Sequence, residues 1–172
     1  MSRIWETPGG VHPPENKQQS MAHNIGHLPL PATLVFPLHQ HIGAPAKVGV
    51  TVGQTVLKGQ KLTDASNLNN LPVHASSSGT VIAIDDKPVA HPSGLNALCV
   101  TIASDGKDQW IEHAGISDFR QCDPLDLLQM ITDAGIAGMG GAGFPAAIKL
   151  SPNHEKPVDT LIINATECEP YI

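Results

Sequence analysis

Aromatic residues are scarce in this chain of 172 residues, which contains two tryptophans, one tyrosine and three phenylalanines. Charged residues make up only 15%, and acidic residues outnumber basic ones, so that the formal net charge is −6. An acidic balance argues against nucleic acid or an anionic membrane surface as a direct partner. Hydrophobic residues still account for 41% of the chain, which is enough for a packed core.

Long hydrophobic runs are also missing. No stretch approaches the roughly 18 consecutive apolar residues that a membrane-spanning helix needs, and the N-terminus does not resemble a signal peptide. The three cysteines, Cys99, Cys122 and Cys168, are far apart and form no CxxC pair, so they predict neither a disulfide framework nor an iron–sulfur site. We expect reduced thiols in a cytoplasmic protein.

Glycine and proline are abundant, with sixteen and fifteen residues, which favours short strands and turns over long helices. Residues 1–30 are polar and proline-rich, and they predict an extended N-terminal arm. The scattered histidines of this arm (His12, His23, His27) and the pair His39 and His41 suggest turn or surface positions more than a metal site, and so does His74.

Residues 31–104 are dominated by strand signals. Short runs of β-branched and apolar residues alternate with turn sequences, including Val52-Gly53-Gln54 and Lys58-Gly59-Gln60. Closely spaced short strands predict a compact all-β sandwich or barrel. The strand candidates are Thr33–Phe36, the segment Lys47–Leu62, Ser78–Ile84 and Leu98–Ala103.

The order VGQxVxKGQxL followed by PVHAxxSGTVxxI resembles the biotinyl/lipoyl-type hammerhead, or barrel-sandwich hybrid. A carrier of that family needs a lysine at the tip of its central hairpin, because the amine is acylated. The corresponding segment, Thr63–Leu71, contains no lysine. We therefore predict a non-acylated module, which a lipoyl or biotinyl adduct on Lys58 or Lys61 would contradict.

A polar stretch, Ser104–Asp108, is the predicted boundary of a second region, 105–172. A helix is expected to follow, with Asp123 as its N-cap, Pro124 in its first turn and Gly135 just past its end. The expected apolar face consists of Leu125, Leu128, Ile131 and Thr132, broadened by Leu127 and Met130.

Four glycines then lie within six residues, at Gly138, Gly140, Gly141 and Gly143. Glycine lets backbone amides approach an anion closely, and Phe144-Pro145 behind the cluster predicts the start of a short helix whose N-terminus favours an anion. An apolar run, Thr160–Ile163, predicts a buried strand. The polar residues after it lie where α/β sheets bind ligands.

The paired pattern GxGGAGFPxxxK and NAxExEP resembles the FMN-binding domain of the NADH-oxidising flavoprotein subunit of respiratory complex I. Together with the hammerhead, the whole chain resembles the N-terminal part of the RnfC-type protein of the bacterial Rnf (Rsx) electron-transport complex. The resemblance implies a mixed fold: a barrel-sandwich hybrid followed by the first part of an α/β FMN-binding domain.

This resemblance also implies roles for individual residues. The glycine loop would border FMN and the nicotinamide site, Phe144 would stack near NADH, and Lys149 would lie near a phosphate. Hydride transfer needs no acid or base from the protein, so no catalytic residue is assigned. Two positions depart from complex I, because Met139 replaces an arginine and Thr166 an aspartate. The strand-end positions implied to contact the flavin are Asn164, Thr166 and Glu167, and the one implied to contact NADH is Glu169.

The expected activity is that of an electron-transfer subunit which passes electrons between NAD(H), FMN and two 4Fe-4S clusters. The cluster motifs of the family are expected beyond Ile172, so we interpret the chain as an N-terminal fragment that alone binds FMN weakly or not at all. An α/β domain with one strand cannot close its sheet, and its exposed edge favours self-association.

The resemblance further implies other Rnf subunits as partners and a peripheral position on the cytoplasmic side of the bacterial inner membrane. An alternative function of a different class is a docking module whose glycine loop is vestigial. The intact pair of motifs favours the electron-transfer reading.

Overall fold

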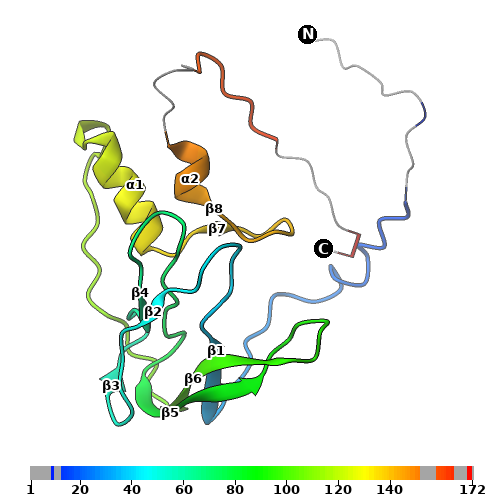
Figure 1. Ribbon diagram of the computed structural model, residues 1–172. Helices are drawn as coiled ribbons and strands as arrows, with labels where there is room; N and C mark the ends of the chain where they lie inside the picture. Colours follow the sequence, from blue (N-terminus) through cyan, green and yellow to red (C-terminus); the bar gives the residue numbers. More distant parts are fainter. Residues whose placement is uncertain (1–8, 10–12, 152–157, 165–169, 172) are drawn as a thin grey trace. The chain divides into compact units, whose positions relative to one another are not determined.

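The computed structural model describes residues 9, 13–151, 158–164, 170 and 171 (Figure 1). The chain divides into two compact units. The main unit is Leu30–Lys156, and the terminal unit combines Met1–Pro29 with Pro157–Ile172. Every strand and helix described below belongs to the main unit.

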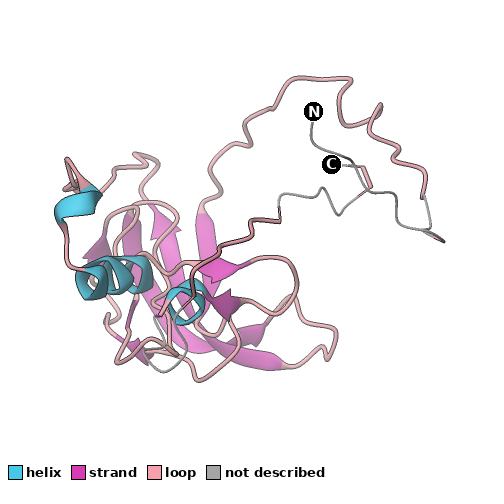
Figure 2. Ribbon diagram, turned by 90° about the horizontal axis from the view of Figure 1, so that it is seen from above, coloured by secondary structure: helices cyan, strands magenta, loops and turns pink. Residues whose placement is uncertain are grey.

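A four-stranded antiparallel sheet with the order β1-β6-β5-β3 forms the larger part of the β structure (Figure 2). A register shift between Val81 and Ala83 bends β5 where it pairs with β6. A second pair, β2 with β4, is also antiparallel. The strand bounds are β1 Thr33–Pro37, β2 Lys47–Val48, β3 Thr55–Val56, β4 Thr63–Asp64, β5 Gly79–Pro88 and β6 Asn96–Ser104.

One hydrophobic core lies between these strands and the segments that connect them. Each strand turns alternate side chains inward, so short strands suffice to fill it. This arrangement confirms the predicted barrel-sandwich hybrid. The core cluster consists of Phe36, Leu38, Val50, Val56, Leu62, Val73, Ala75, Val81, Val100 and Ile102.

Both predicted glycine turns form. Gly53 and Gly59 have φ of 90° and 82°, in the left-handed region that favours glycine. Gly59 also has no room for a side chain, because an added Cβ would lie 2.9 Å from the Trp110 ring. Trp110 in turn lies under the ammonium group of Lys58, 4.8 Å from its ring centroid.

Helix α1 spans Pro124–Asp133 and follows a short 3-10 helix, η1, at Phe119–Gln121. The Asp123 carboxylate accepts a hydrogen bond from the Leu125 N–H at 2.8 Å, which confirms the predicted N-cap. Gly135 follows the C-cap with φ of 69°. Two backbone bonds close this end, from the Gly135 N–H to Thr132 and from the Ile136 N–H to Ile131, as in a Schellman motif.

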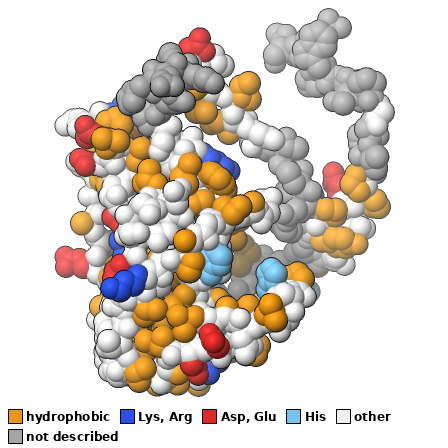
Figure 3. Space-filling view, in the orientation of Figure 1, with side chains coloured by type: hydrophobic (Ala, Val, Ile, Leu, Met, Phe, Trp, Pro, Cys, Tyr) orange, Lys and Arg blue, Asp and Glu red, His pale blue; other side chains and the backbone are white. Residues whose placement is uncertain are grey.

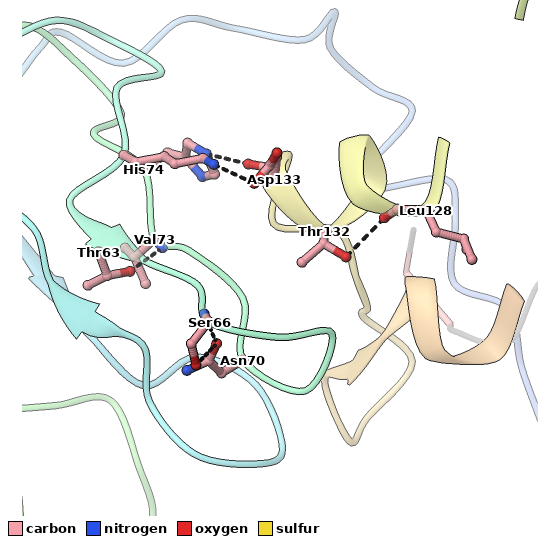
Figure 4. Close-up of polar contacts among 9 residues, drawn as sticks. Thr63, Ser66, Asn70, Val73, His74, Leu128, Thr132 and Asp133 are labelled. Atoms are coloured by element: carbon pink, nitrogen blue, oxygen red, sulfur yellow. Dashed lines mark hydrogen bonds and ion pairs between the residues drawn. The ribbon is translucent and has the colours of Figure 1, made fainter. Parts of the chain in front are cut away.

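The buried face of α1 is narrower than predicted. Leu128 and Thr132 are buried, whereas Leu125 is 68% exposed. Leu125 lies in the first turn of α1, where only one side of the helix meets the rest of the unit. The Thr132 hydroxyl satisfies itself inside the helix by donating to the Leu128 carbonyl at 2.9 Å (Figure 4). Helix α2, Ala146–Leu150, contacts α1 and buries Ala147.

The terminal unit contains no helix or strand among its described residues. Its backbone is joined by a hydrogen bond from the Tyr171 N–H to the Glu15 carbonyl at 2.8 Å. The prediction of a buried strand at Thr160–Ile163 is wrong, because Leu161, Ile162 and Ile163 are 80%, 86% and 78% exposed. An apolar run becomes a strand only when a neighbour pairs with its backbone, and no strand that the structure describes does so.

Candidate functional site

The glycine cluster forms a hairpin. Strand β7, Ala137–Gly138, pairs with β8, Phe144–Pro145, and Gly138 lies opposite Phe144. The five residues between them turn the chain back on itself, helped by Gly141 and Gly143, whose φ values are 135° and 59°. The cluster is thus a folded turn with paired ends.

This hairpin brings three of the predicted site residues together. The Lys149 ammonium group lies 5.7 Å from the centroid of the Phe144 ring. It also lies 3.3 Å from the point where a Cβ on Gly138 would stand. Because Gly138 has no side chain, the cation can lie directly against the hairpin backbone.

The tip of the hairpin is open. A Cβ added at Gly140 or Gly141 would meet no other atom within 4 Å, and the Met139 side chain is 97% exposed. Figure 3 shows hydrophobic side chains exposed on the same face of the main unit, in the area of α2. The structure therefore presents a backbone loop with free space over it and one ammonium group beside its base.

The hairpin is attached to the barrel at its C-terminal end. The Ile42 N–H donates a hydrogen bond to the Gly143 carbonyl at 3.1 Å. A Cβ on Gly143 would lie 3.1 Å from the His41 Cα and 3.3 Å from the Gln40 carbonyl oxygen. This contact needs glycine for its close approach as well as for its positive φ.

A second attachment lies at the N-terminal end of the hairpin, at Gly135. A Cβ there would lie 2.7 Å from the Pro72 carbonyl oxygen and 3.2 Å from the His74 ring. The His74 Nε2 hydrogen bonds to the Asp133 carbonyl at 3.0 Å, and the Lys61 ammonium pairs with the Asp133 carboxylate at 2.5 Å (Figure 4). The barrel thus holds the C-terminal end of α1 by three neighbouring contacts.

The environment of His74 favours its neutral form. Burial is the main cause that lowers its pKa, and the Lys61 ammonium lowers it further. The hydrogen bond to the Asp133 carbonyl and the Asp133 charge raise the pKa, but they do not outweigh burial.

His41 is fixed by two hydrogen bonds to the backbone. Its Nε2 accepts from the Leu71 N–H at 3.0 Å, so its Nδ1 carries the hydrogen and donates to the Ile42 carbonyl at 2.9 Å. The sequence suggested a polar turn here. The buried anchoring role of His41, which is only 8% exposed, follows from contacts with Leu71 thirty residues away.

Two features of the predicted anion site differ from expectation. Pro145 is the N-cap of α2, one position before the first helical turn, and it makes no side-chain capping bond. Helix α2 is only five residues long, and β8 lies between it and the glycine turn. The helix N-terminus therefore does not directly follow the glycines, because the hairpin pairs residues there instead.

The remaining predicted site residues do not belong to the main unit. Asn164 is exposed and is part of the terminal unit. Thr166, Glu167 and Glu169 lie outside the described residues. The structure therefore brings together Gly138, Gly140, Gly141 and Gly143 with Phe144 and Lys149, and the roles of the strand-end residues stay predictions.

The barrel also contributes a pocket that the sequence did not indicate. A cavity of about 970 Å³ lies between the Gly59 turn, Trp110 and the C-terminal end of α1. Both of its lysines are paired with aspartates, Lys58 with Asp108 and Lys61 with Asp133. A smaller cavity of about 390 Å³ lies between the barrel and the hairpin, with Leu71 and Met139 among its lining residues.

Neither of the two helices offers a membrane span. Among the described residues, no helix is long and apolar enough to cross a membrane. Groups of three or more potential metal ligands are likewise absent from the part of the chain that the structure describes.

Comparisons with known proteins match both halves of the chain. Residues 5–107 match the family described as the RnfC barrel sandwich hybrid domain, and residues 131–172 match the Nuo51 FMN-binding domain. The matched relatives include RnfC-type proteins of ion-translocating oxidoreductase complexes from Serratia proteamaculans, Edwardsiella ictaluri and Vibrio cholerae, which are 52%, 50% and 49% identical over 170 residues. The match covers 99% of this chain and 24%, 21% and 22% of these relatives. The chain thus spans about a quarter of the length of the curated relatives it matches.

Proposed function

Because the chain belongs to the RnfC family, whose members are subunits of ion-translocating oxidoreductase complexes, we propose that its glycine hairpin forms one wall of an FMN site used in electron transfer with NAD(H). The observation that carries this proposal is the juxtaposition of Lys149 with the backbone of Gly138 beside an open glycine turn. The match of residues 131–172 to an FMN-binding domain supports the same assignment.

The residues of the hairpin fit a flavin phosphate in chemical terms. Backbone at Gly140 and Gly141 is accessible without any side chain in the way, which permits close approach of an anion. Lys149 supplies a cation, and its pairing with the Phe144 ring orients the ammonium group toward the hairpin. Bound FMN would supply the redox chemistry, and the protein would supply orientation and charge.

The strand-end residues would complete the site. We assign Asn164, Thr166 and Glu167 to the flavin and Glu169 to NADH, all in positioning roles. Their polar groups would hold the ring by hydrogen bonds, while electrons pass to 4Fe-4S clusters outside this chain. Other subunits of the complex would be the partners, at the cytoplasmic face of the inner membrane.

The proposal is tested with a chimera in which this chain replaces the 170 matching residues of the Serratia proteamaculans relative. Flavin fluorescence and visible absorbance measure FMN binding by the chimera and by the isolated chain. We expect the chimera to bind FMN and to be bleached by NADH, and the chain alone to bind weakly or not at all. A chimera that folds but binds no flavin, beside a parent protein that does, would favour the docking-module alternative.

A further inference from the structure

We propose that the barrel positions the glycine hairpin by clamping both of its ends, with Gly135 held against Pro72 and His74 and with Gly143 held against His41 and Ile42. This inference rests on the proposed function, because it gives the barrel a part in shaping the flavin site. It assigns His41 and His74, which lie outside the glycine loop, as positioning residues for FMN.

The first clamp acts where α1 delivers the chain to the hairpin. The His74 Nε2 and the Lys61 ammonium both bind Asp133, the last residue of α1. Gly135 lies two residues later and approaches the Pro72 carbonyl so closely that any side chain would displace it. These contacts fix the direction in which β7 leaves the helix.

The second clamp acts where the hairpin returns. The Ile42 N–H binds the Gly143 carbonyl, and the bare Cα of Gly143 lies against the His41 backbone. His41 itself is held by Leu71 on one ring nitrogen and by the Ile42 carbonyl on the other. A buried ring with both nitrogens bonded has little freedom, so it gives the hairpin a rigid point of contact.

Between the clamps, the hairpin closes on itself. β7 pairs with β8, and the Ala146 N–H donates to the Ile136 carbonyl at 2.9 Å just outside that pair. The turn at Gly140 and Gly141 therefore extends from a base whose two ends are both fixed to the barrel. A backbone anion site depends on such fixed geometry, because a displacement of about 1 Å is enough to weaken it.

The sharpest test compares glycines in the same loop. Gly143→Ala should break the second clamp, because its Cβ meets backbone atoms at 3.1 and 3.3 Å. Gly140→Ala should leave the clamp intact, because its Cβ meets nothing within 4 Å. Gly115→Ala, which also meets nothing and lies outside the loop, is the control for folding.

The direct readout is amide hydrogen exchange of Ile42, whose N–H binds Gly143. We expect Gly143→Ala to speed this exchange by about tenfold or more in the isolated chain, while Gly140→Ala and Gly115→Ala leave it unchanged. In the chimera, Gly143→Ala should weaken FMN binding by about tenfold, and Gly115→Ala should not change it.

His74 is tested by conservative rescue. His74→Leu removes the N–H that binds the Asp133 carbonyl, whereas His74→Gln retains an N–H donor of similar reach. FMN affinity should fall in the Leu variant and recover at least partly in the Gln variant, with the thermal unfolding midpoint of the barrel measured for both. A purely space-filling role would make Leu the better replacement, which is the opposite order.

The outcomes separate this inference from the proposed function. If the unmodified chimera binds no FMN, the proposed function is wrong, and the exchange rate of the Ile42 amide alone then decides whether the clamp exists. If the unmodified chimera binds FMN and Gly143→Ala changes neither that exchange nor the FMN affinity, the positioning inference is wrong.

Discussion

The His74 ring of the barrel hydrogen bonds through Nε2 to the carbonyl oxygen of Asp133, the last residue of α1, at 3.0 Å. Two segments 59 residues apart in the sequence are joined by this bond. The orphan carbonyls at a helix C-terminus need such donors, and a histidine there satisfies one of them. The bond links the barrel to the helix that carries the glycine hairpin.

The first prediction is a pH dependence of stability that comes from His74. Burial lowers its pKa below the ordinary value of about 6.5, so the folded protein favours the neutral ring. Unfolded chains bind the proton more readily, and the contribution of His74 is fully present above pH 6.5 and is lost as the pH falls through the lower folded pKa. Urea unfolding of the wild type should therefore show falling stability below about pH 6.5.

The control for that prediction is His74→Gln, which has no titrating group at this position. The variant should show a smaller loss of stability over the same pH range. If the wild type and His74→Gln lose stability in parallel, another group is responsible and the neutral His74 is not required for folding.

The second prediction concerns Gly135. Gly135→Ala should destabilise the chain by about 1–3 kcal/mol, because alanine is strained at a φ of 69° and its Cβ would press on the Pro72 carbonyl. Gly115→Ala is the matched control, since its Cβ meets no atom within 4 Å. Chemical denaturation measures both. Equal stability of the two variants would mean that the approach of Gly135 to Pro72 is looser than the structure shows.

Most of the barrel was predictable because its signals are local. β-branched alternation and the turns at Gly53 and Gly59 depend only on neighbouring residues, and they predicted the strands that form. The ends of α1 were predictable for the same reason, since Asp123 and Gly135 act within a turn of the helix.

The contacts that shape the candidate site were not predictable from local pattern. His41 accepts a hydrogen bond from Leu71, and His74 meets Asp133, both across the fold. No spacing in the sequence encodes either pair, so both histidines resembled ordinary turn residues. Thr160–Ile163 failed in the opposite way, because its apolar pattern predicts a strand but says nothing about whether a partner strand pairs with it.

The third prediction tests the N-terminal cap of α1. Asp123→Ala should cost about 1 kcal/mol, because the Leu125 N–H loses its acceptor, whereas Asp123→Asn should keep most of the stability. Gln129→Ala, at an exposed position within α1, is the control because both residues are good helix formers. Thermal unfolding followed by circular dichroism distinguishes them. A loss in Gln129→Ala equal to that in Asp123→Ala would show that the cap contributes nothing specific.

The fourth prediction concerns Lys149, the one cation that the structure shows against the hairpin backbone within the described residues. If Lys149 binds a flavin phosphate, Lys149→Met in the chimera should weaken FMN binding by about tenfold or more, since hydrogen bonds to charged groups contribute about 1.5–3 kcal/mol. Lys149→Arg should retain more affinity because it keeps the charge. Titration of FMN followed by flavin fluorescence measures all three proteins.

Lys107→Met provides the matched control, because Lys107 is an exposed lysine remote from the hairpin in sequence. It should bind FMN like the wild type. The loss in Lys149→Met should shrink as salt rises, because screening weakens the charge interaction in the unmodified protein. An affinity of Lys149→Met equal to that of Lys107→Met at low salt would remove Lys149 from the site. Phosphate binding would then depend on the glycine backbone alone, and Gly140→Ala would become the decisive variant.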